Sequence, residues 1–205
     1  MLAYVFWHRP LEGSAVDSYE QALAHFHRSL AHARPAGFQS SAVFRVSELP
    51  WLESSGATQT QRAPGGGCGY EDWYFVDDYT ALGVLNEAAV GHGHRSVHDD
   101  LARHFGAGAG GLYGLIEGHP PAGPASLDRA SVAVWVRRSP GVQRRGLGEL
   151  LGDGMDPRHA SLWRRQLVLG PAPEFCLLAR KAPPGVALPR LPEGWTAAVC
   201  EREAL

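Results

Sequence analysis

The sequence alternates short apolar runs with polar, glycine-rich or proline-rich segments, and these runs predict most of the secondary structure. Residues 2–9 are rich in aromatic and β-branched side chains and stop at Pro10, so they predict a strand. Three further strands are expected at 38–47, 71–78 and 112–117. The glycine-rich residues 106–111 are expected to break a helix just before the last of these strands.

Between the first two strands, apolar residues recur at helical spacing. The residues of this stripe are Val16, Tyr19, Leu23, Phe26 and Leu30. They predict one helix with a single apolar face, which ends at Arg34–Gly37. Asp17 and Glu20 at its start have the spacing of a capping box.

A second helical stretch, TALGVLNEAAV, follows the third expected strand. Asp77 or Asp78 can cap its start, and Gly91 is a natural residue to follow its end. A short helix is expected after it, with Ser96 as its N-cap. The resulting order, β-α-β-β-α-β, is that of a ferredoxin-like unit with both helices on one face of an antiparallel sheet.

The second half of the chain repeats this strand pattern. The run SVAVWVRRSPG at 131–141 echoes LAYVFWHRPLEG at the start, and three later runs take the places of the other strands. One helix is absent in this copy, because four prolines fall in PPGVALPRLP, and the other is shortened to GLGELLGDGM. We therefore expect a first repeat at 1–117, a Pro/Gly linker at 118–130 and a degenerate second repeat at 131–205.

This order of elements resembles the dimeric α/β-barrel (ferredoxin-like) superfamily, in the form that fuses both copies in one chain. The resemblance rests on the order of elements and on no diagnostic motif. It implies an α+β fold in which two ferredoxin-like halves, βαββαβ plus a degenerate second copy, pack their antiparallel sheets as an intrachain α/β barrel. The alternative is two unrelated sheets of similar composition. The superfamily includes cofactor-independent monooxygenases, isomerases, lyases and haem enzymes, so the fold leaves the function open.

Composition narrows the possible partners. The 205 residues are 44% hydrophobic and 20% charged with net charge −2, which is ordinary for a globular protein and gives no basic footprint for nucleic acid. No apolar run reaches the roughly 18 residues of a membrane span. The start lacks the features of a signal peptide, and the three cysteines form no CxxC pair, so a cytoplasmic location is expected. Cys68 has no neighbour in the sequence that would activate it.

The first candidate for chemistry is His8, at the end of the first expected strand. Strand alternation places Tyr4, Phe6 and His8 on one face and Val5, Trp7 and Arg9 on the other. Aligning the two repeats matches Phe6 with Trp135 and His8 with Arg137. We therefore expect His8 to act as an acid, base or donor near the barrel mouth, unless it simply reaches solvent.

A small anionic or enolisable organic molecule bound in a barrel pocket is the leading functional hypothesis. The expected anion partners are Arg9, Arg45 and Arg137. The expected apolar walls are Trp73 and Trp135. No cofactor is expected, and a homo-oligomer is compatible with the sequence.

Two alternatives remain open at this point. His92, His94 and His98 are close enough in the sequence to hold a divalent metal, although their spacing matches no established motif. They are otherwise polar residues around a turn, or part of an anion pocket at the following helix. The other alternative is a non-catalytic structural or oligomerisation module.

Overall fold

The computed structural model describes most of the chain. The described residues are 1–46, 69–91, 95–120, 132–139, 141, 160–168, 173–179, 191 and 193–205. Along the chain the elements are β1 (Leu2–Pro10), α1 (Val16–Ala33), β2 (Phe38–Val46), β3 (Gly69–Val76), α3 (Tyr79–Val90), α4 (Arg95–Ala102), β4 (Phe105–Gly118), β5 (Val132–Arg138), β6 (Ala160–Val168), β7 (Phe175–Ala179) and β8 (Trp195–Ala204).

The eight strands form one closed antiparallel barrel in the order β1-β3-β2-β8-β5-β7-β6-β4. Within it, β4-β1-β3-β2 and β8-β5-β7-β6 have the same internal order, which is the ferredoxin-like order. The two halves are hydrogen-bonded edge to edge, β2 to β8 and β4 to β6, instead of meeting only face to face as two separate sheets. Edge pairing satisfies the backbone groups that open sheet edges would expose.

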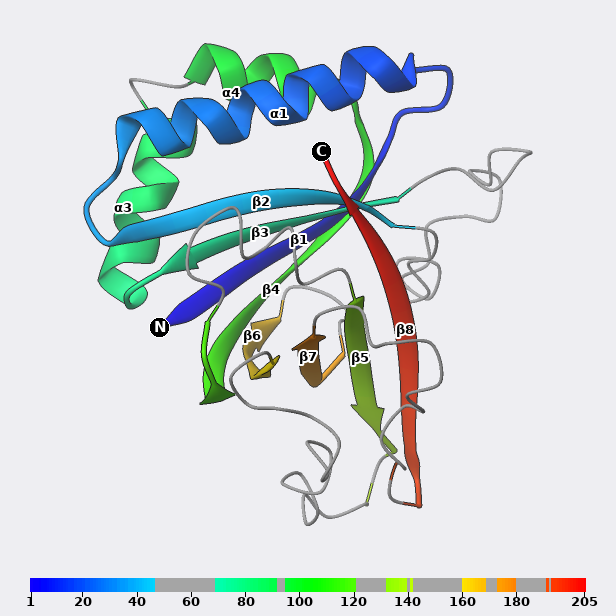
Figure 1. The fold of residues 1–205 in the computed structure, drawn as a ribbon. Helices are drawn as coiled ribbons and strands as arrows, with labels where there is room; N and C mark the ends of the chain where they lie inside the picture. The colour runs from blue at the N-terminus through cyan, green and yellow to red at the C-terminus, as the bar shows by residue number, and fades with distance from the viewer. Residues whose placement is uncertain are drawn as a thin grey trace.

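Three helices, α1, α3 and α4, cover the outer face of β1–β4 (Figure 1). Most of the predicted stripe of α1 packs here, with Tyr19, Leu23, Phe26 and Leu30 buried against the sheet, whereas Val16 is exposed. A separate cluster of aromatic and aliphatic side chains packs inside the barrel. Because both layers need apolar residues, β3 is buried along its whole length. Among the described helices, none is both long and apolar enough to cross a membrane.

The helix ends follow the sequence only in part. Asp78 caps α3 by accepting a hydrogen bond from the Ala81 amide at 2.9 Å, as expected. The predicted capping box at the start of α1 is wrong. The N-cap residue is Ala15, whose side chain caps no backbone amide. Glu20 instead accepts hydrogen bonds from Arg45 and Tyr70, because these donors on the sheet lie beneath it.

The start of the next helix and strand also differ from the prediction. Ser96 is not an N-cap, because α4 already begins at Arg95. The glycines at 106–111 lie inside β4 and do not end the helix. A Cβ on Gly108 would lie 2.5 Å from Cζ of Phe6, so glycine leaves room for an aromatic ring against the strand. The strands expected in the second half are present as β5–β8, and the shortened helix lies outside the described residues.

Candidate functional site

Strand β3 holds two consecutive acidic residues that face opposite sides of the barrel wall. Glu71 points into the barrel, and Asp72 points toward the helices, because side chains alternate along a strand. Both are buried, with 0% and 1% exposure. Buried carboxylates are costly unless hydrogen-bonded or paired, so each needs its own set of partners.

On the helix side, three groups form a hydrogen-bonded line. Nε2 of His8 lies 3.0 Å from Oδ1 of Asp72, and Nδ1 of His8 lies 2.5 Å from the Tyr19 hydroxyl. The line joins β3, β1 and the first turn of α1. His8 is completely buried, so its ring nitrogens have no direct contact with bulk water.

Asp72 is held by further partners. The Tyr74 hydroxyl donates to Oδ2 at 3.0 Å, and Nε2 of His27 lies 3.6 Å from the same oxygen. Burial alone would raise the pKa of Asp72, but the charge and hydrogen bond of His8 and the nearby His27 outweigh it and hold this pKa well below its usual range. Asp72 is therefore a fixed negative charge at neutral pH.

An ionised Asp72 orients His8 with its Nε2 proton toward the carboxylate. Neutral His8 then accepts the Tyr19 proton at Nδ1, and protonated His8 donates from Nδ1 to the Tyr19 oxygen. Burial and the negative Asp72 raise the pKa of Tyr19 above its usual value, so Tyr19 is a phenol at neutral pH. The Nε2 proton thus faces Asp72 in both cases, and the Nδ1–Tyr19 contact holds a second proton that either atom can carry.

Aromatic rings enclose the His8 imidazole. Phe6 and Tyr70 stack on it, with ring centroids at 5.2 and 5.6 Å, and Phe105 packs at 5.0 Å. These rings exclude water from the imidazole and leave its two nitrogens to Asp72 and Tyr19.

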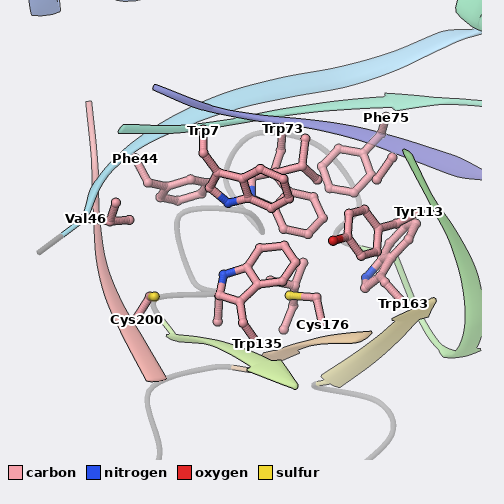
Figure 2. Packing of buried hydrophobic residues seen from close by; sticks show 14 residues of the cluster. Trp7, Phe44, Val46, Trp73, Phe75, Tyr113, Trp135, Trp163, Cys176 and Cys200 are labelled. Atoms are coloured by element: carbon pink, nitrogen blue, oxygen red, sulfur yellow. The ribbon is translucent and has the colours of Figure 1, made fainter. Parts of the chain in front are cut away.

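Inside the barrel, Glu71 is the acceptor for three tryptophans. Trp73 donates to Oε1 at 2.6 Å, while Trp7 and Trp135 donate to Oε2 at 3.1 and 3.0 Å. Trp7 and Trp73 come from the first half and Trp135 from the second, and they lie close together in the packed interior (Figure 2). One carboxylate thus links the two halves of the barrel.

Arg202 of β8 also lies beside this carboxylate. Its Nη1 is 3.4 Å from Oε1 of Glu71, and its Cζ is 3.5 Å from the ring centroid of Phe44. Burial lowers the pKa of Arg202, and the negative charge of Glu71 partly offsets this effect by raising it. The arginine nevertheless remains cationic at neutral pH. The interior therefore contains an ion pair within an aromatic core.

Several solved structures match this chain, three of them over nearly its full length. An anthrone oxidase-like protein matches with TM-score 0.53 and 9% identity, over 99% of this chain and 92% of that one. A chlorite dismutase-like protein matches with TM-score 0.50 and 12% identity, over 100% and 96%. A monooxygenase-like protein from Lactobacillus acidophilus matches with TM-score 0.51 and 8% identity, over 100% and 98%. The fold is that of the dimeric α/β-barrel superfamily. No protein-family model matches the sequence, and no curated protein matches it significantly.

Within this α/β barrel, His8 is not at the mouth. It faces the helix layer, because the barrel side of β1 is the side of Val5 and Trp7. Trp7 and Trp135 both point inward, whereas the sequence alignment matched Trp135 with Phe6, which faces the helix layer.

The other predicted site residues are dispersed. Trp73 and Trp135 are interior, as expected of walls, but their indole groups donate to Glu71. Arg45 lies on the outer face, where it pairs with Glu20 at 2.7 Å and with Glu203 at 2.7 Å. Arg137 is exposed near the end of β5, and Arg9 is half-buried near the end of β1. The structure thus does not gather the predicted arginines around His8.

The predicted metal ligands can be placed only in part. His92 and His94 lie outside the described residues. The thiol of Cys68, which was not among the predicted metal ligands, lies outside them too. His98 is half-buried in α4, with Nδ1 3.3 Å from Oδ1 of Asp99. Within the described ranges, no group of three or more His, Cys, Asp or Glu side chains is placed to hold a metal ion. The metal hypothesis stays a prediction, which elemental analysis of the purified protein tests.

Sequence reasoning missed most residues of the two buried networks. Among those missed are Tyr19, Glu71, Asp72 and Arg202. The available signal was the pair Glu71–Asp72 inside an otherwise aromatic and apolar strand, where acidic residues need buried partners. Tyr19 was placed only in the apolar stripe of the first helix, and the position of Arg202 in the sequence gave no signal.

Proposed function

We propose that the chain is an acid–base enzyme for a small organic molecule with an acidic C–H or O–H group, such as an enolisable ketone or a phenol. The observation that carries the proposal is the buried line from Asp72 through His8 to Tyr19. It has the order carboxylate, imidazole, hydroxyl, in which the imidazole takes the proton of a hydroxyl and the carboxylate stabilises the imidazolium. Proton transfer of this kind typically accelerates a reaction about 10²–10⁴-fold.

In the proposed reaction, Tyr19 is the group that meets the substrate. A substrate proton passes to the Tyr19 oxygen as the phenol proton passes to Nδ1 of His8. Asp72 holds the resulting imidazolium from the other side. Return of the proton to a different substrate atom gives an isomerase, and expulsion of a leaving group gives a lyase.

Substrate access requires movement of the first turn of α1, because Tyr19 is only 1% exposed. This turn begins at Ala15 without a side-chain cap, and Val16 at its start is 45% exposed. Uncapped first turns open more readily than capped ones, which places the weakest part of the helix next to Tyr19.

The similarity to anthrone oxidase-like and monooxygenase-like proteins supports an oxidative variant, in which the deprotonated substrate reacts with oxygen without a cofactor. These matches concern the fold alone, so the residues above carry the assignment. The shared strand order of the two halves also supports the proposal that the second half is a degenerate internal repeat of the first.

Exchange of substrate hydrogen for deuterium in D₂O tests proton abstraction independently of later steps. We expect the protein to accelerate exchange in at least one member of a panel of enolisable ketones and phenols, and Tyr19→Phe to slow it about 10²–10⁴-fold. Tyr113→Phe is the matched control, because its hydroxyl donates to the Pro173 carbonyl, away from this line. Equal exchange by wild type and Tyr19→Phe, or no acceleration by wild type, would reject the proposal.

A structural role is the second candidate, because both ring nitrogens of His8 already have partners inside the protein. In that case Tyr19→Phe would change stability and leave no catalytic effect to detect. Unfolding measurements on the same variants therefore separate the two roles.

A further inference from the structure

The guanidinium of Arg202 is enclosed in the barrel, and the described part of the chain offers its donors no acceptor with hydrogen-bond geometry. Its side chain has 0% exposure, and among the described residues none accepts a hydrogen bond from Nε, Nη1 or Nη2. Glu71 is near, but its 3.4 Å approach to Nη1 is an ion pair without hydrogen-bond geometry. Buried donors without acceptors are rare in native proteins because their lost hydration is not replaced.

Glu71 does not need Arg202 to satisfy its carboxylate. Its Oε1 accepts the Trp73 indole, and its Oε2 accepts the Trp7 and Trp135 indoles. Several N–H donors can stabilise a carboxylate without a cation. The charge of Arg202 is paired with Glu71, but its N–H donors remain available to another acceptor.

The position of Arg202 defines what such an acceptor must look like. The ring of Phe44 covers one face of the guanidinium, with Cζ 3.5 Å above its centroid, and Trp73 lies 5.5 Å away. Stacking on the face leaves the donors along the edge of the plane. Two parallel N–H donors in a rigid plane match the two oxygens of a carboxylate.

We propose that Arg202 binds a small planar monoanion, a carboxylate of about the size of formate or acetate, in the barrel interior beside Phe44. A single charge suits the site because Glu71 lies next to it, and a dianion such as hydrogen phosphate would meet stronger repulsion in this dry interior. The site lies on the opposite side of β3 from Asp72, so it goes beyond the proposed acid–base function and does not depend on it.

The indole N–H resonances of the protein report on this site directly. We would titrate ¹⁵N-tryptophan-labelled protein with sodium formate and follow the resonances of Trp7, Trp73 and Trp135, which share Glu71. Trp195 is the internal control, because it belongs to the cluster on the outer face. We expect saturable shifts of the first three and none of Trp195, with sodium chloride and sodium phosphate at matched ionic strength giving no saturable shift. Saturable phosphate binding instead of formate binding would overturn the assignment.

Two variants test the role of the arginine. Arg202→Met removes the donors at similar volume and should abolish the saturable shift. Arg202→Lys keeps a charge but loses the planar fork, and we expect at least about tenfold weaker formate binding. Formate binding that is unchanged in either variant would overturn the proposal. If neither variant folds, the wild-type titration still decides, because the absence of a saturable shift at Trp73 would by itself reject the site.

Discussion

Glu71 and Asp72 are neighbours in β3, and their carboxylates lie on opposite sides of the barrel wall. Glu71 collects three indole N–H groups and the charge of Arg202 from inside the barrel. On the side of the helices, Asp72 contacts the imidazoles of His8 and His27 and the phenol of Tyr74. One strand therefore organises two separate buried networks on its two faces.

Removing Glu71 from the interior ion pair should destabilise the protein more than removing Arg202. Glu71→Gln leaves Arg202 as an unpaired buried cation, so we expect it to lower the free energy of unfolding by about 3–5 kcal/mol. Arg202→Met leaves Glu71 with its three indole donors, so we expect a loss at least about 1 kcal/mol smaller. Urea denaturation of both variants measures the difference. An equal or larger loss in Arg202→Met would show that the indoles do not satisfy the carboxylate.

Asp72 should make the protein sensitive to acid. Its pKa is depressed in the folded state, so the unfolded chain binds more protons between the two pKa values. Stability from Asp72 is then fully present above its unfolded pKa of about 3.9 and is lost as pH falls below that value. We expect Asp72→Asn to be less stable at neutral pH and to show a shallower decline in acid. Asp17→Asn, at an exposed position, is the control and should follow the wild-type curve.

The buried phenols should limit stability in alkali. Burial and the charge of Asp72 raise the folded pKa values of Tyr19 and Tyr74, so the unfolded chain loses these protons first. Their stabilisation is complete below the unfolded pKa of about 10 and is lost as pH rises above it. The free energy of unfolding, measured from pH 8 upward, should fall less steeply in Tyr74→Phe than in wild type. Identical slopes would mean that the phenolate of Tyr74 is tolerated in the fold.

Gly108 should be required for the packing of Phe6 beside His8. The added Cβ of Gly108→Ala would lie 2.5 Å from Phe6, so we expect a loss of about 1–3 kcal/mol from overpacking. Gly83→Ala in α3 is the matched control, because its Cβ would meet nothing within 4 Å. That change should stabilise the helix by about 0.5–1 kcal/mol. Thermal unfolding distinguishes the two, and opposite signs are the expected result.

The alternation in β1 shows what the sequence could predict. It placed Phe6 and His8 on one face and Val5 and Trp7 on the other, and the structure has this arrangement. It could not tell which face lines the barrel, because helices cover one side and strands the other, so both sides are apolar. For the same reason the sequence alignment matched the inward-facing Trp135 with Phe6, which faces the helices.

The partners of the two carboxylates were beyond sequence reasoning for a different reason. Arg202 meets Glu71 only because β8 closes the barrel against β2, and this closure depends on the whole topology. Arg45 read as a free anion ligand, but α1 and β8 bring Glu20 and Glu203 to it. Local patterns predict strands and helices, whereas long-range ion pairs depend on how the elements are assembled.

The position of two acidic residues side by side in β3 has a consequence for how this strand finds its register. Because β3 is apolar on both faces, the alternation of hydrophobic side chains alone does not determine which face turns inward. A slip by one residue would move Asp72 among the indoles and Glu71 beneath α1, and each would lose its partners. The misregistered sheet would then bury unpaired charges, at a cost of several kcal/mol each. The two carboxylates therefore favour one of two otherwise similar registers of β3.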